Sequence, residues 1–275
     1  WSGFPKDLNT KNAQSHLEEI RNAIFSGDYE KAEKIANSDF HGHWCESYLP
    51  FGNLLIDFKS AVSRKGYRRT LDISKGIAKT ECKDITETVF ASNPADLIVV
   101  NLKSESGFSC DISFSSQLQN KVYTKEDTLI VEGSAPEICQ PPYHTDGEPI
   151  VYGDKAMKFA GAAKILGDAS FEGDKIVISN QKEITILISL ATSFVDFKSM
   201  PTANAFERAM ARFENIKPYK LLLEEHIADF SSLFDRVELD LGDGNSDMPT
   251  NKRLKAVKKG ASDDALVALL FQYGR

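Results

Sequence analysis

The sequence predicts a mainly β protein with flanking helices, built around a large antiparallel β-sandwich. Between residues 54 and 191 the apolar residues repeat mostly with a period of two, and every second residue from Phe108 to Phe114 is apolar. This alternation is typical of antiparallel strands that bury one face. Turns rich in Gly, Asn, Ser and Pro separate most of these short runs, which favours a sandwich over a βαβ fold. Towards both ends of the chain the apolar period becomes helical.

Two short helices are expected before the strands, within residues 10–38. Thr10 is a suitable N-cap for the first helix, and Gly27 is a suitable residue to end it. Asp28 can cap the second helix, which is expected to turn Tyr29 and the apolar residues that follow it inward.

About ten strands are expected after these helices, because runs rich in β-branched and aromatic residues recur between turn residues. They cover residues 54–58, 67–73, 77–82, 85–90, 96–102, 108–115, 128–132, 157–166, 175–179 and 183–191.

Helices are expected again after Phe194. One covers residues 203–213, and a longer one covers 219–234 with an apolar face. A lone strand is expected at 237–241, and Pro249 opens a short basic helix at a position where proline is tolerated.

This pattern divides the chain into two parts. Residues 1–200 are expected to form a β-sandwich domain with short N-terminal helices, and residues 201–275 a helical linker. The last helix can be capped by Ser262 and carries an apolar stripe from Leu266 to Tyr273. Because so apolar a helix needs a partner surface, we expect the chain to be a piece of a larger protein.

The charge of the chain argues against some partners. A net charge of −7 and a pI of about 5.4 disfavour a nucleic acid or an anionic membrane surface. The one basic run, at 252–259, is expected to be the solvated face of its helix. No apolar stretch reaches membrane-spanning length, so a membrane is not expected as a partner.

The four cysteines do not have the spacing of a structural zinc site. Cys45, Cys82, Cys110 and Cys139 include no C-x-x-C pair, and neither a metal nor another cofactor is expected. Three disulfide pairings are possible, and the sequence does not choose among them. Two of these cysteines, Cys82 and Cys110, lie in expected strands, where buried free thiols are the simplest interpretation.

One cluster has residue types suited to binding a sugar. His41, His43 and Trp44 lie together before the first expected strand. Tryptophan faces stack on sugar rings, and imidazoles can hydrogen-bond hydroxyl groups. We expect these three residues to be candidate substrate-binding residues. The preferred interpretation is nevertheless a surface loop whose Trp packs on its own domain.

The charged residues of the long helix are expected to be structural. Glu224 and Glu225 are expected to face solvent, which does not indicate a catalytic pair. His226 and Asp229 lie three residues apart on one helical face and could hydrogen-bond each other. A structural brace is the preferred interpretation over a charge relay, and no residue of this chain is expected to be catalytic.

The order of short phrases along the chain carries a further indication. Trp1-Ser2-Gly3 comes first, and Leu270-Phe271-Gln272-Tyr273-Gly274-Arg275 comes last. The phrases between them lie at 20–22, 27–33, 48–54, 67–72, 89–94, 191–194, 226–230, 233–237 and 249–254. Together they span the chain, and this succession resembles the amino-terminal portion of glycoside hydrolase family 95, the inverting α-L-fucosidase family. Some members of that family act on α-L-galactosides.

The resemblance implies a β-sandwich and a helical linker, followed in the family by an (α/α)6 barrel that this chain would enter only at its first helix. The family's catalytic carboxylates and asparagines lie in that barrel, beyond Arg275. Such enzymes protonate the leaving oxygen with one carboxylic acid while a base activates water across the ring. The implied partners are the protein's own catalytic barrel and a fucosylated or L-galactosylated glycan.

The expected function is therefore that of a non-catalytic N-terminal portion of an α-L-fucosidase-like hydrolase, inactive alone and supporting the barrel. The alternative is a carbohydrate-binding β-sandwich module without hydrolytic activity, and a purely structural domain is a third possibility. The family suggests a periplasmic or secreted location, and the sequence leaves the compartment, the sugar and the linkage open.

Overall fold

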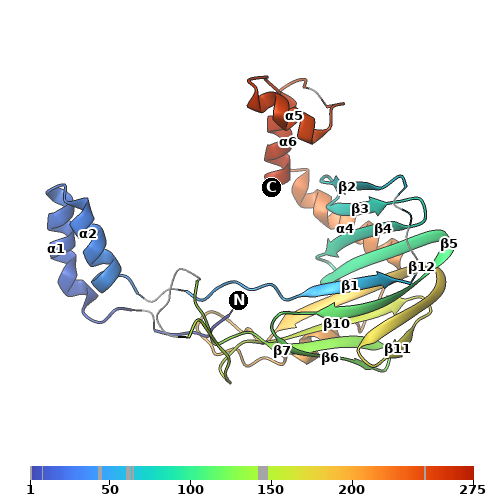
Figure 1. Cartoon of the computed structure of the whole chain (residues 1–275), viewed down its shortest axis with the longest axis horizontal. Coiled ribbons are helices and arrows are strands. Elements are labelled where there is room, and N and C mark those ends of the chain that lie inside the picture. Colours follow the sequence, from blue (N-terminus) through green and yellow to red (C-terminus); the bar gives the residue numbers. More distant parts are fainter. Residues whose placement is uncertain are drawn as a thin grey trace.

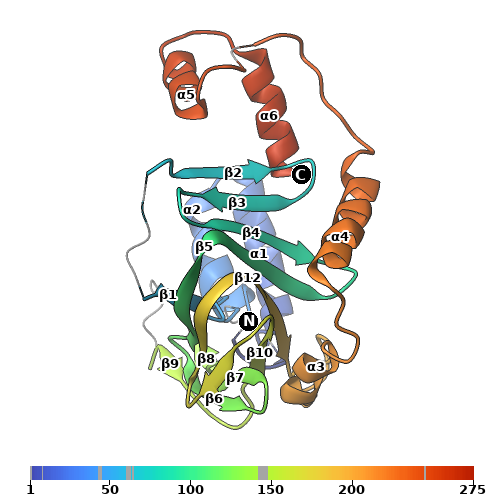
Figure 2. The same cartoon turned by 90° about the vertical axis from the view of Figure 1, so that its right-hand side faces the viewer.

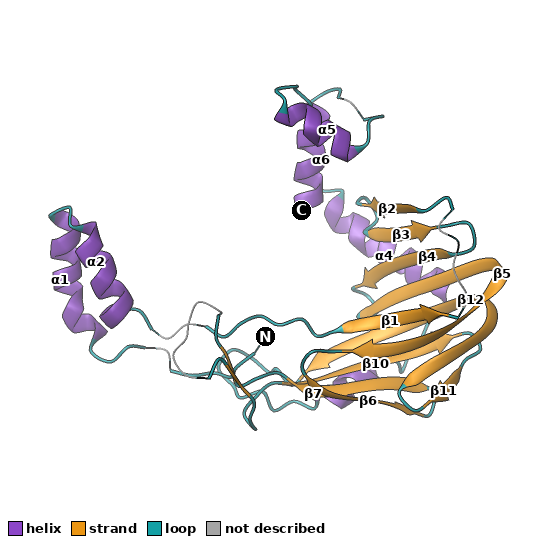
Figure 3. Ribbon diagram, in the orientation of Figure 1, coloured by secondary structure: helices purple, strands orange, loops and turns teal. Residues whose placement is uncertain are grey.

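A computed structural model describes residues 2–7, 9–42, 45–59, 63, 65–141, 148–244 and 246–275. A curled antiparallel sheet forms the body of the molecule (Figure 1). A hairpin of two helices stands away from one end of this sheet, and the C-terminal helices pass over another edge (Figure 3).

Ten strands of the described chain join this sheet, and every pairing between them is antiparallel. The main path runs β2-β3-β4-β5-β12-β10-β7-β6, while β1 pairs with β5 and β11 pairs with β12. A separate pair of short strands, β8 and β9, lies apart from the main sheet. The strands are β1 (Asn53–Phe58), β2 (Arg68–Asp72), β3 (Ile77–Glu81), β4 (Thr86–Ser92), β5 (Leu97–Ser115), β6 (Gln119–Lys125), β7 (Thr128–Ser134), β8 (Ile138–Cys139), β9 (Ile150–Val151), β10 (Lys158–Leu166), β11 (Ser170–Glu172) and β12 (Lys175–Thr192).

Two long strands make a sandwich out of this one sheet. The first half of β5 pairs with β4 and its second half with β1, while β12 follows β5 along both halves. The register of the β5–β12 pair shifts between Ile178 and Glu183, where bulges let the strands bend. The two halves therefore belong to two layers that face each other over a common core.

The core between the layers is aliphatic and aromatic. Leu102, Ile112, Ile176 and Ile186 are fully buried there. Each such side chain contributes about 1.5–3 kcal/mol when it leaves water. The predicted fold class, a mainly β protein with a large antiparallel sandwich and flanking helices, is confirmed.

The strand predictions differ from the structure in two ways. The runs predicted at 96–102 and 108–115 are one strand, β5, and those at 175–179 and 183–191 are one strand, β12. The polar residues between these runs suggested turns, but they lie where the long strands bend. Four strands were not predicted, namely β6, β8, β9 and β11, because their sequences are short or polar.

The N-terminal helices are α1 (Ala13–Phe25) and α2 (Tyr29–Ile35), with a π-helical turn (Ala36–Phe40) after α2. Gly27 has a φ of 80° just beyond α1, and the Asp28 side chain accepts a hydrogen bond from Lys31 N at 3.1 Å, as predicted. Two expectations were wrong. Thr10 does not cap α1, because its hydroxyl donates to His41 O, and Tyr29 points into solvent.

Two helices cover the outer face of one layer. They are α3 (Ala205–Ala211) and α4 (Tyr219–Phe234), which match the predicted helices closely. Leu222 of α4 and Phe213 after α3 pack with Phe90 and Leu187 in a second apolar core. Figure 2 shows α4 lying beside β3 and β4.

The last two helices are α5 (Thr250–Lys258) and α6 (Asp264–Gly274). Arg253 and Asp263 join them through two hydrogen bonds, Nε to Oδ2 at 2.8 Å and Nη2 to Oδ1 at 2.7 Å. Arg253 is only 5% exposed, so the prediction that the whole basic run is solvated was wrong at this residue. Asp263, rather than Ser262, caps α6 by accepting a hydrogen bond from Leu266 N at 3.0 Å.

Residues 237–241, predicted as a lone strand, are irregular. Alternation alone does not make a strand where no neighbouring strand supplies hydrogen bonds. At the far end of α6, Arg275 Nη2 donates to Phe234 O at 2.7 Å and holds α6 against the end of α4. No helix of the described chain is both long enough and apolar enough to cross a membrane.

Candidate functional site

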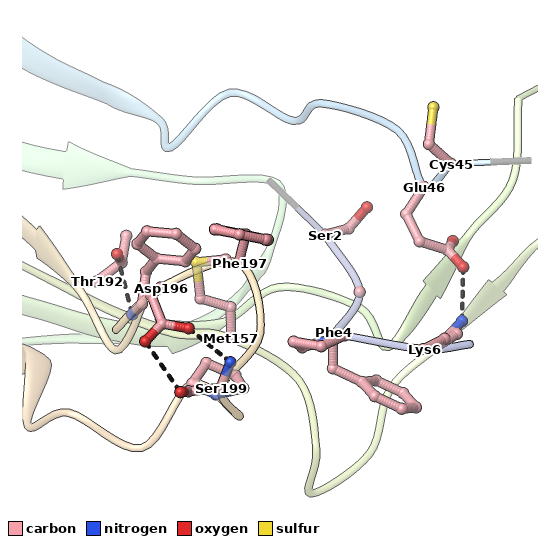
Figure 4. A pocket seen from close by; sticks show the side chains of 14 residues that line it. Ser2, Phe4, Lys6, Cys45, Glu46, Met157, Thr192, Asp196, Phe197 and Ser199 are labelled. Atoms are coloured by element: carbon pink, nitrogen blue, oxygen red, sulfur yellow. Dashed lines mark hydrogen bonds and ion pairs between the residues drawn. The ribbon is translucent and has the colours of Figure 1, made fainter. Parts of the chain in front are cut away.

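One hollow of the described surface has a volume of about 650 Å³. Four segments that are distant in sequence line it, namely residues 2–6, residues 45–46, Met157 before β10, and the end of β12 with the loop that follows it up to residue 201 (Figure 4). Its walls are mostly apolar with a few polar groups, which is the composition of many ligand pockets.

One wall is held together around Glu46. The Glu46 carboxylate accepts a hydrogen bond from Lys6 Nζ at 2.8 Å and another from Cys139 N at 2.5 Å. Gly3 has a φ of 87°, and a Cβ there would lie 2.6 Å from Glu46 Cγ. Glycine at this position therefore allows the N-terminal segment to lie directly against Glu46.

The opposite wall is a turn organised by Asp196. Its carboxylate accepts hydrogen bonds from Lys198 N at 2.8 Å and Ser199 N at 2.7 Å, and from Ser199 Oγ at 3.0 Å. These bonds, chiefly the one from Lys198 N, lower the pKa of the Asp196 carboxyl. Asp196 is therefore an anion that fixes the loop, and it is not suited to act as a proton donor.

Three aromatic rings, those of Phe4, Phe194 and Phe197, contribute to the apolar lining. Phe197 is 78% exposed on the Asp196 turn, and Phe194 is also exposed. On the other wall, the Lys6 ammonium lies 4.9 Å from the centre of the Phe4 ring, and that of Lys155 lies 5.3 Å from it. Exposed rings beside fixed charges can hold a ring-shaped ligand or an apolar protein surface.

The predicted substrate-binding residues come just before two pocket-lining residues in the sequence. His41 is exposed, while His43 and Trp44 lie outside the described residues. The next two residues, Cys45 and Glu46, line the pocket. The structure does not test the prediction that the three residues bind a substrate, and it stays a prediction.

Sequence reasoning missed Phe4, Asp196 and Phe197. Their signal was weak, because Phe4 and Phe197 lie in irregular segments and the two walls are nearly two hundred residues apart in the sequence. A useful clue was Asp196 with Lys198 and Ser199 after it, since an Asp that starts a turn often bonds the amides two and three residues later.

A second hollow, of about 540 Å³, lies between α4, α6 and the β2–β3 turn. His226 is buried at its base, where Nε2 lies 2.8 Å from Lys75 O and the ring stacks on Phe90 with the centroids 4.7 Å apart. Asp229 accepts a hydrogen bond from Asn93 Nδ2 at 3.3 Å. The two helix residues thus bind different parts of the sheet, which is a bracing arrangement.

The cysteines recorded by the structure are free thiols, with Cys110 buried and Cys82 partly buried. Among the described residues, no group of three or more His, Cys, Asp or Glu side chains is arranged to hold a metal ion.

The chain belongs to a family of glycoside hydrolase N-terminal domains, because the model of that family matches more than half of it. Residues 1–196 match the family described as "Glycosyl hydrolase family 65, N-terminal domain", and residues 218–275 match "Glycosyl hydrolase family 95 catalytic domain". The resemblance to family 95 is thereby confirmed. The second match takes in α4, α5 and α6, and the predicted division at residue 200 stays a prediction.

Particular relatives agree with this class. The chain is 26% identical to "Alpha-L-fucosidase 2" of Arabidopsis thaliana over 310 aligned positions, covering 100% of this chain and 36% of the relative. It is 23% identical to "Probable alpha-fucosidase A" of Aspergillus niger, covering 83% of this chain and 30% of the relative. The chain therefore spans about a third of the length of these curated relatives.

A solved structure, "Putative kojibiose phosphorylase from human microbiome", is also similar. The TM-score is 0.46 at 9% identity, covering 65% of this chain and 24% of that one.

Proposed function

We propose that these 275 residues are the non-catalytic N-terminal portion of an α-L-fucosidase-like glycoside hydrolase, in which they support a catalytic barrel. The substrate of the whole protein would be a fucosylated or L-galactosylated glycan. The relatives named above support the sugar class, since both carry α-fucosidase names.

The observation that carries this proposal is the exposure of apolar side chains on α6. The helix lies within the stretch that matches a catalytic-domain model, yet Leu270 is 68% exposed and Val267 and Tyr273 are also exposed. Apolar residues at helical spacing are stabilising only when a neighbouring surface covers them. The remaining helices of a barrel would supply such a surface.

The test compares the 275-residue chain with the complete polypeptide that contains it, using an aryl α-L-fucoside and an aryl α-L-galactoside. We expect turnover by the complete polypeptide and none by the 275-residue chain. Turnover by the 275-residue chain itself would refute the non-catalytic role. A complete polypeptide that cleaves neither substrate would refute the assigned sugar class.

A second candidate function is glycan binding without hydrolysis, and the aromatic pocket favours it. Phe194 and Phe197 present exposed rings beside the Asp196 turn. In the sequence, the predicted residues His41, His43 and Trp44 come just before Cys45, which lines the pocket. In this function the rings would stack on a sugar face.

Calorimetric titration of the 275-residue chain with a fucosylated oligosaccharide tests this second function. Binding that is lost in both Trp44→Ala and Phe197→Ala, and retained in Tyr67→Ala, would support it. Tyr67 is a suitable control because it is exposed and lies outside the residues that line the pocket. Absence of binding would leave the supporting role alone.

A further inference from the structure

The hairpin of α1 and α2 has too little core to be stable alone. Its buried residues are Ile20, Ala23 and Ala32, with partly buried apolar residues around them. Helices of this length are marginal in water and depend on tertiary packing. Figures 1 and 3 show the hairpin standing away from the sheet, so the sandwich does not supply this packing.

The tip of the hairpin, where α1 connects to α2, is nevertheless fixed by several hydrogen bonds. Backbone hydrogen bonds from Ser26, Gly27 and Asp28 to the carbonyl groups of the last turn of α1 close the connection between the helices. The Asp28 side chain caps the first turn of α2. This tip presents a defined surface rather than a loose loop.

That surface is apolar. Phe25 is 85% exposed, Tyr29 is 68% exposed, and Ile24 lies beside them at the end of α1. We call these three residues the tip patch. Exposed apolar side chains that gather at one place on the surface are typical of sites that bind another protein surface.

We propose that the tip patch docks on the catalytic domain of the same polypeptide, so that this domain is held at two places, by α6 and by the hairpin. The proposal rests on the function proposed above. Its new element is a second contact, more than two hundred residues before α6 in the sequence.

The arrangement of the molecule favours this occupant. Figure 1 places the hairpin beyond one end of the sheet and α6 above its β2 edge, with no other described part of the chain drawn between their upper ends, and Figure 2 shows the hairpin below α6 in the perpendicular view. Residues 218–275 match the catalytic-domain model, and this chain covers only 36% of the Arabidopsis relative. A catalytic domain continuing from α6 would therefore lie in the region that the hairpin borders.

Hydrogen exchange tests the docking, with the 275-residue chain and the complete polypeptide measured under the same conditions. We expect amides of residues 20–32 to exchange at least ~10-fold more slowly in the complete polypeptide, because docking suppresses local opening. Equal exchange in the two proteins would overturn the proposal. Slow exchange in the 275-residue chain that appears only on dimerisation would also overturn it, in favour of a second copy.

Two matched variants of the complete polypeptide locate the contact. Phe25→Asp places a carboxylate in the tip patch, and Asn22→Asp places the same group one helical turn earlier on an exposed residue of α1. We expect Phe25→Asp to lose the protection of the hairpin and Asn22→Asp to keep it. Equal behaviour of the two variants would contradict docking through the tip patch.

Activity separates the two proposals. A complete polypeptide that hydrolyses fucosides but leaves the hairpin unprotected would overturn the docking and keep the proposed function. A protected hairpin in a polypeptide that cleaves no fucoside or galactoside would overturn the proposed function and keep the docking.

Discussion

The sandwich and the two helical extensions, α1–α2 and α5–α6, are all rich in apolar residues. Only the sandwich buries most of its apolar side chains within its own fold. Leu102 on β5 is completely buried, whereas Leu270 on α6 and Phe25 on α1 are mostly exposed. The sandwich closes two layers over a shared core, and each extension is a pair of helices with one small contact surface. Hydrophobic periodicity therefore predicts which face of an element is to be buried, while the rest of the fold decides what buries it.

The largest expected contrast is in thiol reactivity. Burial, with a smaller contribution from Asp111, raises the pKa of the Cys110 thiol in the sandwich to about 12, so little thiolate exists at neutral pH. Cys45 is exposed and lines the pocket. We expect iodoacetamide to modify Cys45 at pH 8 while Cys110 stays unmodified until the protein unfolds, as measured by peptide mass spectrometry. Early labelling of Cys110 would show that the sandwich opens readily.

A pair of leucine substitutions measures the contrast between the sandwich and α6 as a change in the free energy of unfolding. Leu102→Ala removes a fully buried side chain and is expected to cost about 2–5 kcal/mol. Leu270→Ala in the 275-residue chain is expected to change the free energy of unfolding by less than about 0.5 kcal/mol, because its side chain is exposed. Urea unfolding of both variants checks this, and similar losses would mean that α6 is already covered.

Two glycines with the same backbone conformation test how firmly α4 is held on the sheet. Gly76 and Gly173 both have a φ of 63°, so alanine costs about 1–2 kcal/mol at either position. Only at Gly76 would the new Cβ approach another side chain, lying 2.9 Å from Phe230 Cδ2. We expect Gly76→Ala to be the more destabilising and to speed amide exchange in α4. Equal effects would indicate that Phe230 moves aside freely.

The smallest expected effect is a pH dependence on the outer face of the sandwich. Lys175, 2.8 Å from Asp111, and then Lys59 lower the pKa of the Asp111 carboxyl. A lowered pKa stabilises the folded state above the unfolded pKa of about 3.9, and this contribution is lost as the pH falls through the folded pKa. Asp111→Asn should therefore be less stable than the parent at pH 7, with the difference shrinking below about pH 4. Because the lysines are half-exposed, we expect an effect smaller than that of Leu102→Ala. Unfolding measured at several pH values checks the sign.

The candidate pocket was the least predictable part of the molecule. Glu46, Phe4 and Asp196 come from three segments that no local pattern connects. His41 and its neighbours were chosen because their residue types suit sugar binding, and that reasoning could not indicate which other segments would lie beside them. A pocket formed by irregular segments depends on how the sheet brings their ends together, and periodicity carries no information about this.

The sequence by itself determined the class and the local elements. Alternating residues predicted the strands of the sandwich, and helical spacing predicted α4 at its observed bounds, because burial of one face imposes a period on each element. Only the tertiary structure decided that β5 and β12 are single bent strands shared by two layers, that residues 237–241 have no strand partner and that Arg253 is buried against Asp263. The physical reason is that pairing, bending and burial of a charge depend on which segments meet in space, and residues far apart in the chain settle that.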